Sequence, residues 1–195
     1  MTNKIRARYV GPATLGLGVM GASIYLLMVN ITLAHIEAVS GLIPFDMRPL
    51  GYSFADALTL LDALGADGRA YYLSHQMPLD TVYPALLALT LVGAICWIGQ
   101  RLPKRTLVRA GVTLSLGAAA FDYAENLAIC AMIWNWPNPS VPLVFAASAA
   151  TTAKSVLTSL AVLLTLLLGA MWARRSMAGR RVLRGGGRRA RRVIE

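Results

Sequence analysis

Charged residues are scarce in this chain. Aspartate, glutamate, lysine and arginine make up 14% of its 195 residues, against roughly 25% in an ordinary soluble domain. Hydrophobic residues make up 56%, and the mean hydropathy is +0.57. This composition excludes an ordinary soluble domain and predicts that lipid surrounds much of the chain. The length suits one compact bundle rather than two domains.

Cysteine and histidine are also scarce, with two of each. Cys96 and Cys130 lie in apolar segments at different expected depths, so we expect free thiols rather than a disulfide. His35 and His75 form no HExxH pattern, and the chain has no CxxC pair. We therefore predict neither a metal site nor a bound cofactor. The signatures of serine hydrolases, P-loop enzymes and kinases are missing as well, so the sequence predicts no particular reaction.

Long apolar segments are what the chain does have. A helix needs about 20 residues to cross a membrane, and four segments are long enough. We place these spans at about 10–35, 80–100, 106–134 and 141–173, with a long connection, 37–79, between the first two. The first apolar run is too long for the hydrophobic region of a signal peptide, so we interpret it as an uncleaved span.

Basic residues alternate between the connections. Three precede the first span, four lie between Arg101 and Arg109 without an acid, and nine arginines follow from Arg174 onward. From Glu37 to Asp80 there are six acids and two bases. Because basic connections stay inside, the sequence predicts an all-α polytopic membrane four-helix bundle with both termini in the cytoplasm. We expect it in a bacterial inner membrane.

The two ends of this plan carry their own predictions. In the long outer connection, Ser53 and Asp56 have capping-box spacing, and apolar residues follow at helical intervals until Gly65. We expect a short amphipathic helix there and a second one over 67–75, and the pair should either lie along the outer membrane surface or cap the bundle. The tail, 177–195, should be disordered, with Arg174–Arg192 binding anionic lipid headgroups. No nucleic acid is expected as a partner, because the tail lacks interleaved aromatic residues.

Acidic residues interrupt the third predicted span. Asp122, Glu125 and Asn126 have i, i+3, i+4 spacing, which places them on one helix face. A charge inside a span costs about 2.5–3.5 kcal/mol on insertion scales and indicates a functional site by default. We predict that Asp122 and Glu125 form an acidic centre, which Asn126 orients.

Other polar residues are expected at the same depth. Asp122 lies about 20 Å beyond Arg109, in the outer half of the membrane, and Lys154 lies near the outer boundary. The sequence thus predicts an outer-leaflet pocket. The further ligand-binding candidates around it are His35, Asp80, Tyr83 and Arg69.

Lys154 has two interpretations. It is either the counter-charge of a functional pocket or one partner in a purely structural ion pair with Asp122 or Glu125. Helical side chains lean toward the N-terminus of their helix, so direct contact between Lys154 and Asp122 would need a tilted helix or a bridging water.

Four motifs in combination resemble a family of small uncharacterised bacterial four-helix integral membrane proteins. The resemblance covers about residues 10–173 and leaves out the basic tail. It implies the four-span architecture and marks the polar residues chosen above, but it implies no reaction. The motifs are Gly51-Tyr52-Ser53, Leu64-Gly65-Ala66-Asp67-Gly68-Arg69-Ala70-Tyr71, Leu79-Asp80-Thr81-Val82-Tyr83-Pro84 and Phe121-Asp122-Tyr123-Ala124-Glu125-Asn126.

These observations lead to one expected function and two alternatives. We expect a pocket that binds or chemically processes a lipid or small amphiphile; an enzyme would use Asp122 and Glu125 as general acid and base. The first alternative is a non-catalytic membrane subunit or assembly factor, in which these acids and Lys154 form a structural network. The second is a proton-coupled carrier, which the lack of broken-helix signals disfavours. The expected partners are membrane lipids and another membrane protein or a second copy of the chain.

Overall fold

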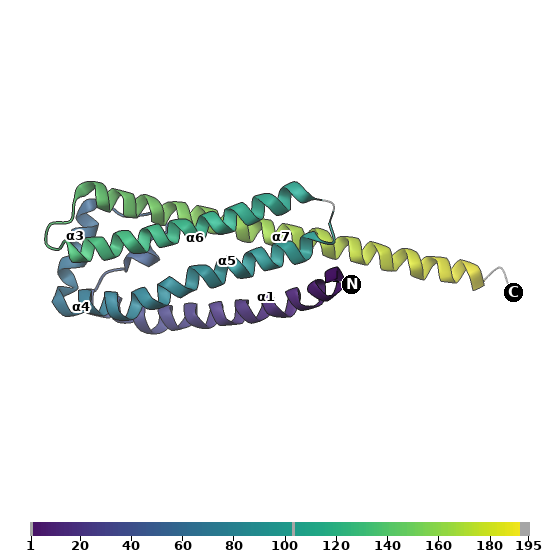
Figure 1. Cartoon of the computed structure of the whole chain (residues 1–195), viewed down its shortest axis with the longest axis horizontal. Helices are drawn as coiled ribbons and strands as arrows, with labels where there is room; N and C mark the ends of the chain where they lie inside the picture. The colour runs from purple at the N-terminus through teal and green to yellow at the C-terminus, as the bar shows by residue number, and fades with distance from the viewer. Residues whose placement is uncertain (1, 103, 192–195) are drawn as a thin grey trace.

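The computed structural model describes the backbone of residues 2–102 and 104–191, and the side chains of 9–102 and 104–177. Every regular element in these ranges is helical, as predicted, and the long helices run side by side (Figure 1). In chain order they are α1 (Thr2–Leu27), η1 (Met28–Thr32), α2 (Leu33–Ser40), η2 (Phe45–Met47), α3 (Phe54–Ala63), α4 (Gly65–Tyr71), η3 (Tyr72–Gln76), α5 (Met77–Gly99), α6 (Arg105–Trp134) and α7 (Val141–Arg191).

Four helices in the described part of the chain are long and apolar enough to cross a membrane. They span Tyr9–Ser40, Gly65–Gly99, Arg105–Trp134 and Val141–Met177, which confirms the prediction of four helices that could cross a membrane. Neighbours in the bundle follow the chain, because α1 packs on α5, α5 on α6, and α6 on α7. Along these seams small residues let the backbones approach, as at Gly111, which lies against Ile95 of α5.

The first two long helices extend beyond the predicted spans. The first continues to Ser40, and the second begins at Gly65 rather than near 80, so only residues 41–64 join them. The helix expected over 67–75 is therefore the start of the helix that becomes α5. Charges such as Asp67 and Arg69 indicated a surface connection, but a helix satisfies its backbone hydrogen bonds in water and in lipid alike. A helix end and a membrane boundary need not coincide.

Two turns of π-helix face each other at the end of the bundle where residues 41–64 connect the first two long helices. The segment η1 interrupts the first long helix, and η3 interrupts the second. They are joined by a buried hydrogen bond of 2.5 Å from the Thr32 hydroxyl to Gln76 Oε1. Because π-helical turns inside α-helices occur frequently at functional sites, this pair indicates a functional site at this end of the bundle.

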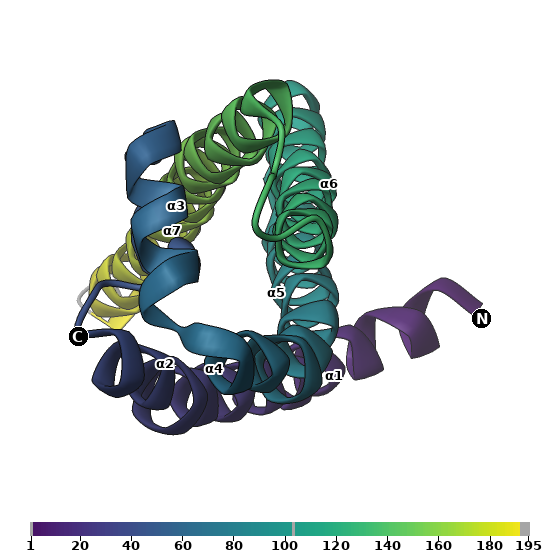
Figure 2. The same ribbon diagram turned by 90° about the vertical axis from the view of Figure 1, so that its left-hand side faces the viewer.

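The helix α3 closes the same end. It lies across the bundle between α4 and α7 (Figure 2), with Ala57, Leu60 and Leu61 fully buried. Ser53 caps it, because the Ser53 hydroxyl accepts from Asp56 N–H and the Asp56 carboxylate accepts from Ser53 N–H. Residues 41–53 lead into it with Phe45 completely buried, so this connection is part of the packed structure.

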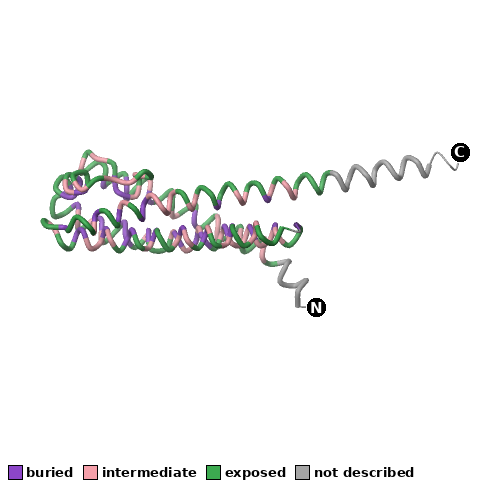
Figure 3. The backbone as a smooth tube through the Cα atoms, turned by 90° about the horizontal axis from the view of Figure 1, so that it is seen from above, coloured by how far each residue is buried: buried purple, intermediate pink, exposed green. Residues whose placement is uncertain are grey.

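Buried residues form two apolar clusters. In Figure 3 the buried positions, in purple, recur along the long helices. The larger cluster lies at the end closed by α3 and includes Phe45, Leu60, Tyr72 and Ile129. The smaller lies at the other end, around Ile95. Polar residues are buried along the helices as well, and they form the site described below.

The helix α7 runs into the basic tail. The helix α7 continues without a break to Arg191, where we expected disorder from 177 onward. Arginine and alanine are good helix formers, so an apolar helix that reaches this stretch can propagate into it. Residues 192–195 lie outside the described backbone, and the side chains beyond Met177, with most of the expected headgroup-binding arginines, lie outside the described side chains.

Candidate functional site

Lys154 forms the centre of a buried ion-pair network. Its Nζ lies 3.0 Å from Asp122 Oδ1 and also contacts Glu125 Oε2. The side chain of Glu125 has no exposed surface, while those of Asp122 and Lys154 are 11% and 13% exposed. The network joins α6 to α7, so the direct contact that the side-chain directions disfavoured does form. A long lysine stem can follow apolar surface to reach its partner.

Thr151 completes the network from α7. Its hydroxyl donates to Glu125 Oε1 over 2.7 Å, and Thr151 is fully buried. Thr151 and Lys154 are three residues apart, as are Asp122 and Glu125 on the facing helix. Because the spacing is equal on the two adjacent helices, Lys154 lies opposite Asp122 and Thr151 lies opposite Glu125.

Asp80 and Asn126 bring α5 into the site. Asn126 Nδ2 donates to the backbone carbonyl of Asp80 over 2.9 Å, and Asp80 is only 2% exposed. The Asp80 carboxyl lies within hydrogen-bonding reach of the Asp46 carboxyl. Asp46 in turn accepts from the Tyr72 hydroxyl of η3.

We call this group of side chains the acidic cluster: Asp46, Asp80, Asp122 and Glu125, with Lys154 as their shared cation. All four carboxyl groups lie near enough to act on the charge of Lys154. They come from η2, α5 and α6, and Lys154 comes from α7. The cluster thus holds more potential negative charge than one ammonium balances, in a place with little water to screen it.

Several polar atoms of this region lack a hydrogen-bond partner within the described residues. Among them are three acceptor oxygens, on Asp46, Asp80 and Asn126, and one donor, Gln76 Nε2. Buried polar groups are nearly always paired in native proteins. The unpaired atoms therefore indicate that protons, waters or a ligand belong here.

Tyr52 lies on the loop side of the acidic cluster. Burial raises the pKa of its hydroxyl, and the nearby Glu125 carboxylate raises it further. Tyr52 is therefore neutral at physiological pH. Its backbone N–H donates to the Ser148 hydroxyl of α7 over 2.8 Å, which holds the loop against that helix.

Three of the predicted ligand-binding residues have other partners. His35 is exposed and stacks on Tyr71, with ring centroids 4.1 Å apart. Arg69 donates to the Leu61 carbonyl over 2.6 Å and lies over the Trp136 ring at 4.9 Å. Tyr83 is half-buried one turn beyond Asp80, and its ring packs on Tyr25, with the centroids 5.6 Å apart. The structure thus groups five of the eight candidates, namely Asp80, Asp122, Glu125, Asn126 and Lys154.

Sequence reasoning missed Asp46, Tyr72, Tyr52, Gln76 and Thr32. The first lies in a connection that we expected to be outside the membrane, and Tyr72 lies in the helix expected over 67–75. One local signal existed, because Asp46 is flanked by Phe45 and Met47 after a proline. Of these neighbours, Phe45 is completely buried and Met47 is exposed.

A small cavity lies one turn below the ion pairs. It has a volume of about 10 Å³, close to the space that one water needs. Its polar lining comes from Asp122, Ser115 and Thr158. A water of this size would meet three polar groups, enough partners to be held there.

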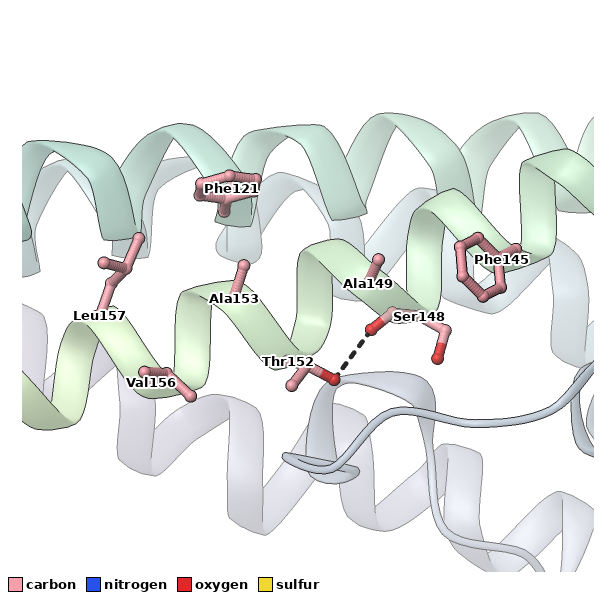
Figure 4. Close-up of a pocket in the computed structure, with 8 residues that line it drawn as sticks. All are labelled: Phe121, Phe145, Ser148, Ala149, Thr152, Ala153, Val156 and Leu157. Atoms are coloured by element: carbon pink, nitrogen blue, oxygen red, sulfur yellow. Dashed lines mark hydrogen bonds between the residues drawn. The ribbon is translucent and has the colours of Figure 1, made fainter.

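An apolar groove runs along the outside of the same helices (Figure 4). Its volume is about 630 Å³, within the range of small-molecule sites. Phe121 of α6 and Leu157, Ala153 and Ala149 of α7 converge on one side of it. The other lining residues are Phe145, Ser148, Thr152 and Val156. We call it the α6–α7 groove.

The loop at Gly51 separates the groove from the acidic cluster. Gly51 has a φ of +83° and packs so closely on α7 that an added Cβ would meet Ser148 Oγ at 2.5 Å and Thr152 Oγ1 at 3.0 Å. Its neighbour Tyr52 lies beside Thr151 and Glu125. These two loop residues therefore adjoin both the groove lining and the acidic cluster.

Metal ligation finds no geometric support in the ranges that the structure describes. No group of three or more histidine, cysteine, aspartate or glutamate side chains there is placed to hold a metal ion. Both cysteines, Cys96 and Cys130, are free thiols.

Comparisons with known proteins give no identification. No model of a protein family, no curated protein and no solved structure matches the chain. The resemblance to small bacterial four-helix membrane proteins therefore stays an expectation.

Proposed function

We propose that this protein binds a lipid or similar amphiphile in the outer leaflet of a bacterial inner membrane. Its apolar chain would lie in the α6–α7 groove, and its polar end would be received at the acidic cluster. The observation that carries this proposal is the position of the groove. Phe121, Thr152 and Ala153 line it, and each is the sequence neighbour of a residue in or beside the cluster: Asp122, Thr151 and Lys154.

The lining of the groove supports an acyl chain as its occupant. Aromatic and aliphatic side chains dominate it, with only two hydroxyl-bearing residues, Ser148 and Thr152. In a bilayer this face of α6 and α7 meets lipid, because Phe121, Phe145 and Val156 are exposed. A concave surface holds a chain in more contacts than a flat one, and dispersion contacts add up.

The chemistry of the acidic cluster supports a polar end that donates hydrogen bonds. Unpaired acceptor oxygens on Asp46, Asp80 and Asn126 outnumber the two unpaired donors, Gln76 Nε2 and the Tyr52 hydroxyl. Hydroxyl or ammonium groups on an amphiphile would pair with such acceptors. The ligand would reach them past Gly51 and Tyr52, whose attachment to α7 includes one hydrogen bond to Ser148.

The membrane placement belongs to the same proposal. With the termini and residues 101–109 in the cytoplasm, the end closed by α3 faces outward, and the acidic cluster lies beneath the outer headgroups. The basic side chains of Arg174 and Arg175 are exposed at the opposite end. They suit the anionic inner surface.

A groove-filling variant tests the proposal. Ala149→Trp fills the α6–α7 groove, and Ala170→Trp introduces the same side chain at an exposed position of α7 outside it. Native mass spectrometry of the purified chain would measure how much lipid each variant retains. We expect Ala149→Trp to retain roughly tenfold less, the effect of about 1.4 kcal/mol, and Ala170→Trp to match the wild type. Equal retention in both variants contradicts the proposal.

The structural alternative has a specific observation in its favour. Lys154 contacts both acids directly, and Thr151 satisfies a further oxygen of Glu125. Such a network can fix helix register without binding anything. Asp122→Asn and Glu125→Gln separate the two functions. Under the ligand proposal these variants stay folded and lose their bound lipid. Under the structural alternative they unfold in detergent, and the fraction that stays folded still retains lipid.

A further inference from the structure

The Asp46 and Asp80 carboxyl groups meet in the interior of the closed end. Asp80, on α5, is only 2% exposed. Asp46, on η2, reaches it from the loop. Asp46 Oδ1 and Asp80 Oδ2 are both buried and have no hydrogen-bond donor among the described residues. Two groups that only accept hydrogen bonds are therefore in contact.

Two ionised carboxylates do not form such a contact. Each would be an acceptor only, and their like charges would repel in a medium that screens poorly. One proton between them removes the conflict, because the protonated acid becomes a donor and the other remains an acceptor. Paired aspartates in other proteins share a proton for this reason.

The surroundings indicate which residue carries the proton. The Tyr72 hydroxyl donates to Asp46 Oδ2, so Asp46 already acts as a hydrogen-bond acceptor. Asp80 has no donor to its unpaired oxygen, because Asn126 Nδ2 donates to the Asp80 backbone carbonyl instead. A proton on Asp80 Oδ2 therefore gives this oxygen a hydrogen bond that no other residue supplies.

We propose that Asp46 and Asp80 form a proton-binding site in which Asp80 Oδ2–H donates to Asp46 Oδ1. This arrangement gives a partner to both unpaired carboxyl oxygens and leaves Asp46 with two donors, Tyr72 and Asp80. The ligand of the site is a single proton, which is released to water when the site ionises.

Charged and titratable groups approach the pair from every packed element. Tyr72 reaches it from η3, Asp122 and Glu125 from α6, and Lys154 from α7. Tyr52 lies on the loop side, near Asp46 and Glu125. Lys154 contacts Asp122 and Glu125 directly, so it is already shared between two acids and does not replace the proton.

The proton connects the loop to the bundle. Asp46 lies in the connection 41–53, and Asp80 lies in a long helix, so the shared proton holds the loop that also contains Gly51 and Tyr52. The site does not depend on amphiphile binding, because the proton forms one hydrogen bond between the two carboxyl groups and leaves further lone pairs on their oxygens to accept from a ligand. Its loss would leave two carboxylates repelling each other beneath the loop.

Infrared spectroscopy of the purified full-length chain tests this site. A protonated carboxylic acid has a C=O stretching band distinct from that of a carboxylate, and exposed aspartates are ionised at neutral pH. We expect the neutral-pH spectrum of the wild type to contain a protonated band that is missing in Asp80→Asn. The control Asp67→Asn changes an exposed aspartate on the same continuous helix and should keep the band.

Two further variants keep the test decisive. In Asp80→Asn the asparagine can still donate to Asp46, so the fold should persist. If this variant does not fold, Asp46→Asn replaces it. The band of Asp80 should then shift, because the group that accepts its hydrogen bond becomes an amide. Tyr72→Phe removes the other donor to Asp46 and should shift the Asp80 band, because Asp46 then accepts from Asp80 alone. A wild-type spectrum without a protonated band, or one unchanged in both aspartate variants, would overturn the proposal.

Discussion

Lys154 is the residue on which the buried charges depend. It is the cation in direct contact with both Asp122 and Glu125. Lys154→Met keeps the length of the side chain and removes the charge. We expect it to destabilise the protein by about 3–5 kcal/mol, the usual cost of leaving one partner of a buried pair uncompensated. Thermal unfolding in detergent measures this loss.

Lys104→Met provides the matched control for Lys154→Met. Lys104 is exposed between α5 and α6, so its loss should change the free energy of unfolding by less than about 0.5 kcal/mol. Similar unfolding temperatures for the two variants would show that the buried network contributes little.

Gly51 is the second residue whose replacement is predicted to matter. Its φ of +83° is unfavourable for an L-residue, and an added Cβ would collide with Ser148. Gly51→Ala should cost about 1–2 kcal/mol for the backbone conformation and a further 1–3 kcal/mol or so for the collision. Gly65→Ala is the control, because Gly65 has a φ of +61° with nothing within 4 Å of the added Cβ. Unfolding experiments that find equal losses would exclude the collision.

At the residue scale the sequence predicted part of the site. Asp122, Glu125 and Lys154 stand out because charges are rare in apolar segments, and the structure brings them into contact. Asp46 lies in a connection without periodicity, so nothing in the sequence pairs it with Asp80. Contacts that depend on how a loop folds back are not contained in a local pattern.

Helix α3 shows what short-range patterns can predict. The Ser53–Asp56 spacing predicted a helix start, and α3 begins at Phe54 with both hydrogen bonds of the capping box. The continuity of α4, η3 and α5 was not predictable in this way, because a π-helical turn has no sequence signature comparable to a cap. The predicted helix boundaries were placed where charged residues begin, whereas helices end where capping and packing stop them.

The capping box of α3 predicts an acid-sensitive element. The Ser53 hydroxyl and then its N–H lower the pKa of Asp56 below its ordinary value of 3.8. A lowered folded-state pKa means that the stabilisation is fully present above pH 3.8, and that it is lost as the pH falls through the folded value. Asp56→Asn should therefore remove part of the acid dependence of unfolding.

Unfolding measured from neutral pH to about pH 2–3 checks this prediction. Asp62→Asn, at another exposed position of the same helix, is the control. Ser53→Ala should lower stability by about 1 kcal/mol. An unchanged acid dependence in Asp56→Asn would show that the carboxylate does not support the helix.

The whole molecule is predicted to have one orientation. Basic connections require both termini and residues 101–109 inside, with residues 41–64 and 135–140 outside. Alkaline phosphatase should therefore be active when fused within 135–140, and green fluorescent protein should fluoresce when fused after the C-terminus. The reverse pattern in a bacterial host would invert the bundle and place the acidic cluster in the inner leaflet.

The central claim is that an amphiphile occupies the α6–α7 groove beside the acidic cluster. Photocrosslinking with a lipid that carries a diazirine in its acyl chain tests it most directly, because the labelled residues can be mapped by mass spectrometry. The account predicts that Phe145, Ala149 and Val156 are labelled well above Leu15 and Val19, which are exposed apolar residues of α1. An excess of unlabelled lipid should remove the difference. Equal labelling of the groove and of α1 would contradict the claim.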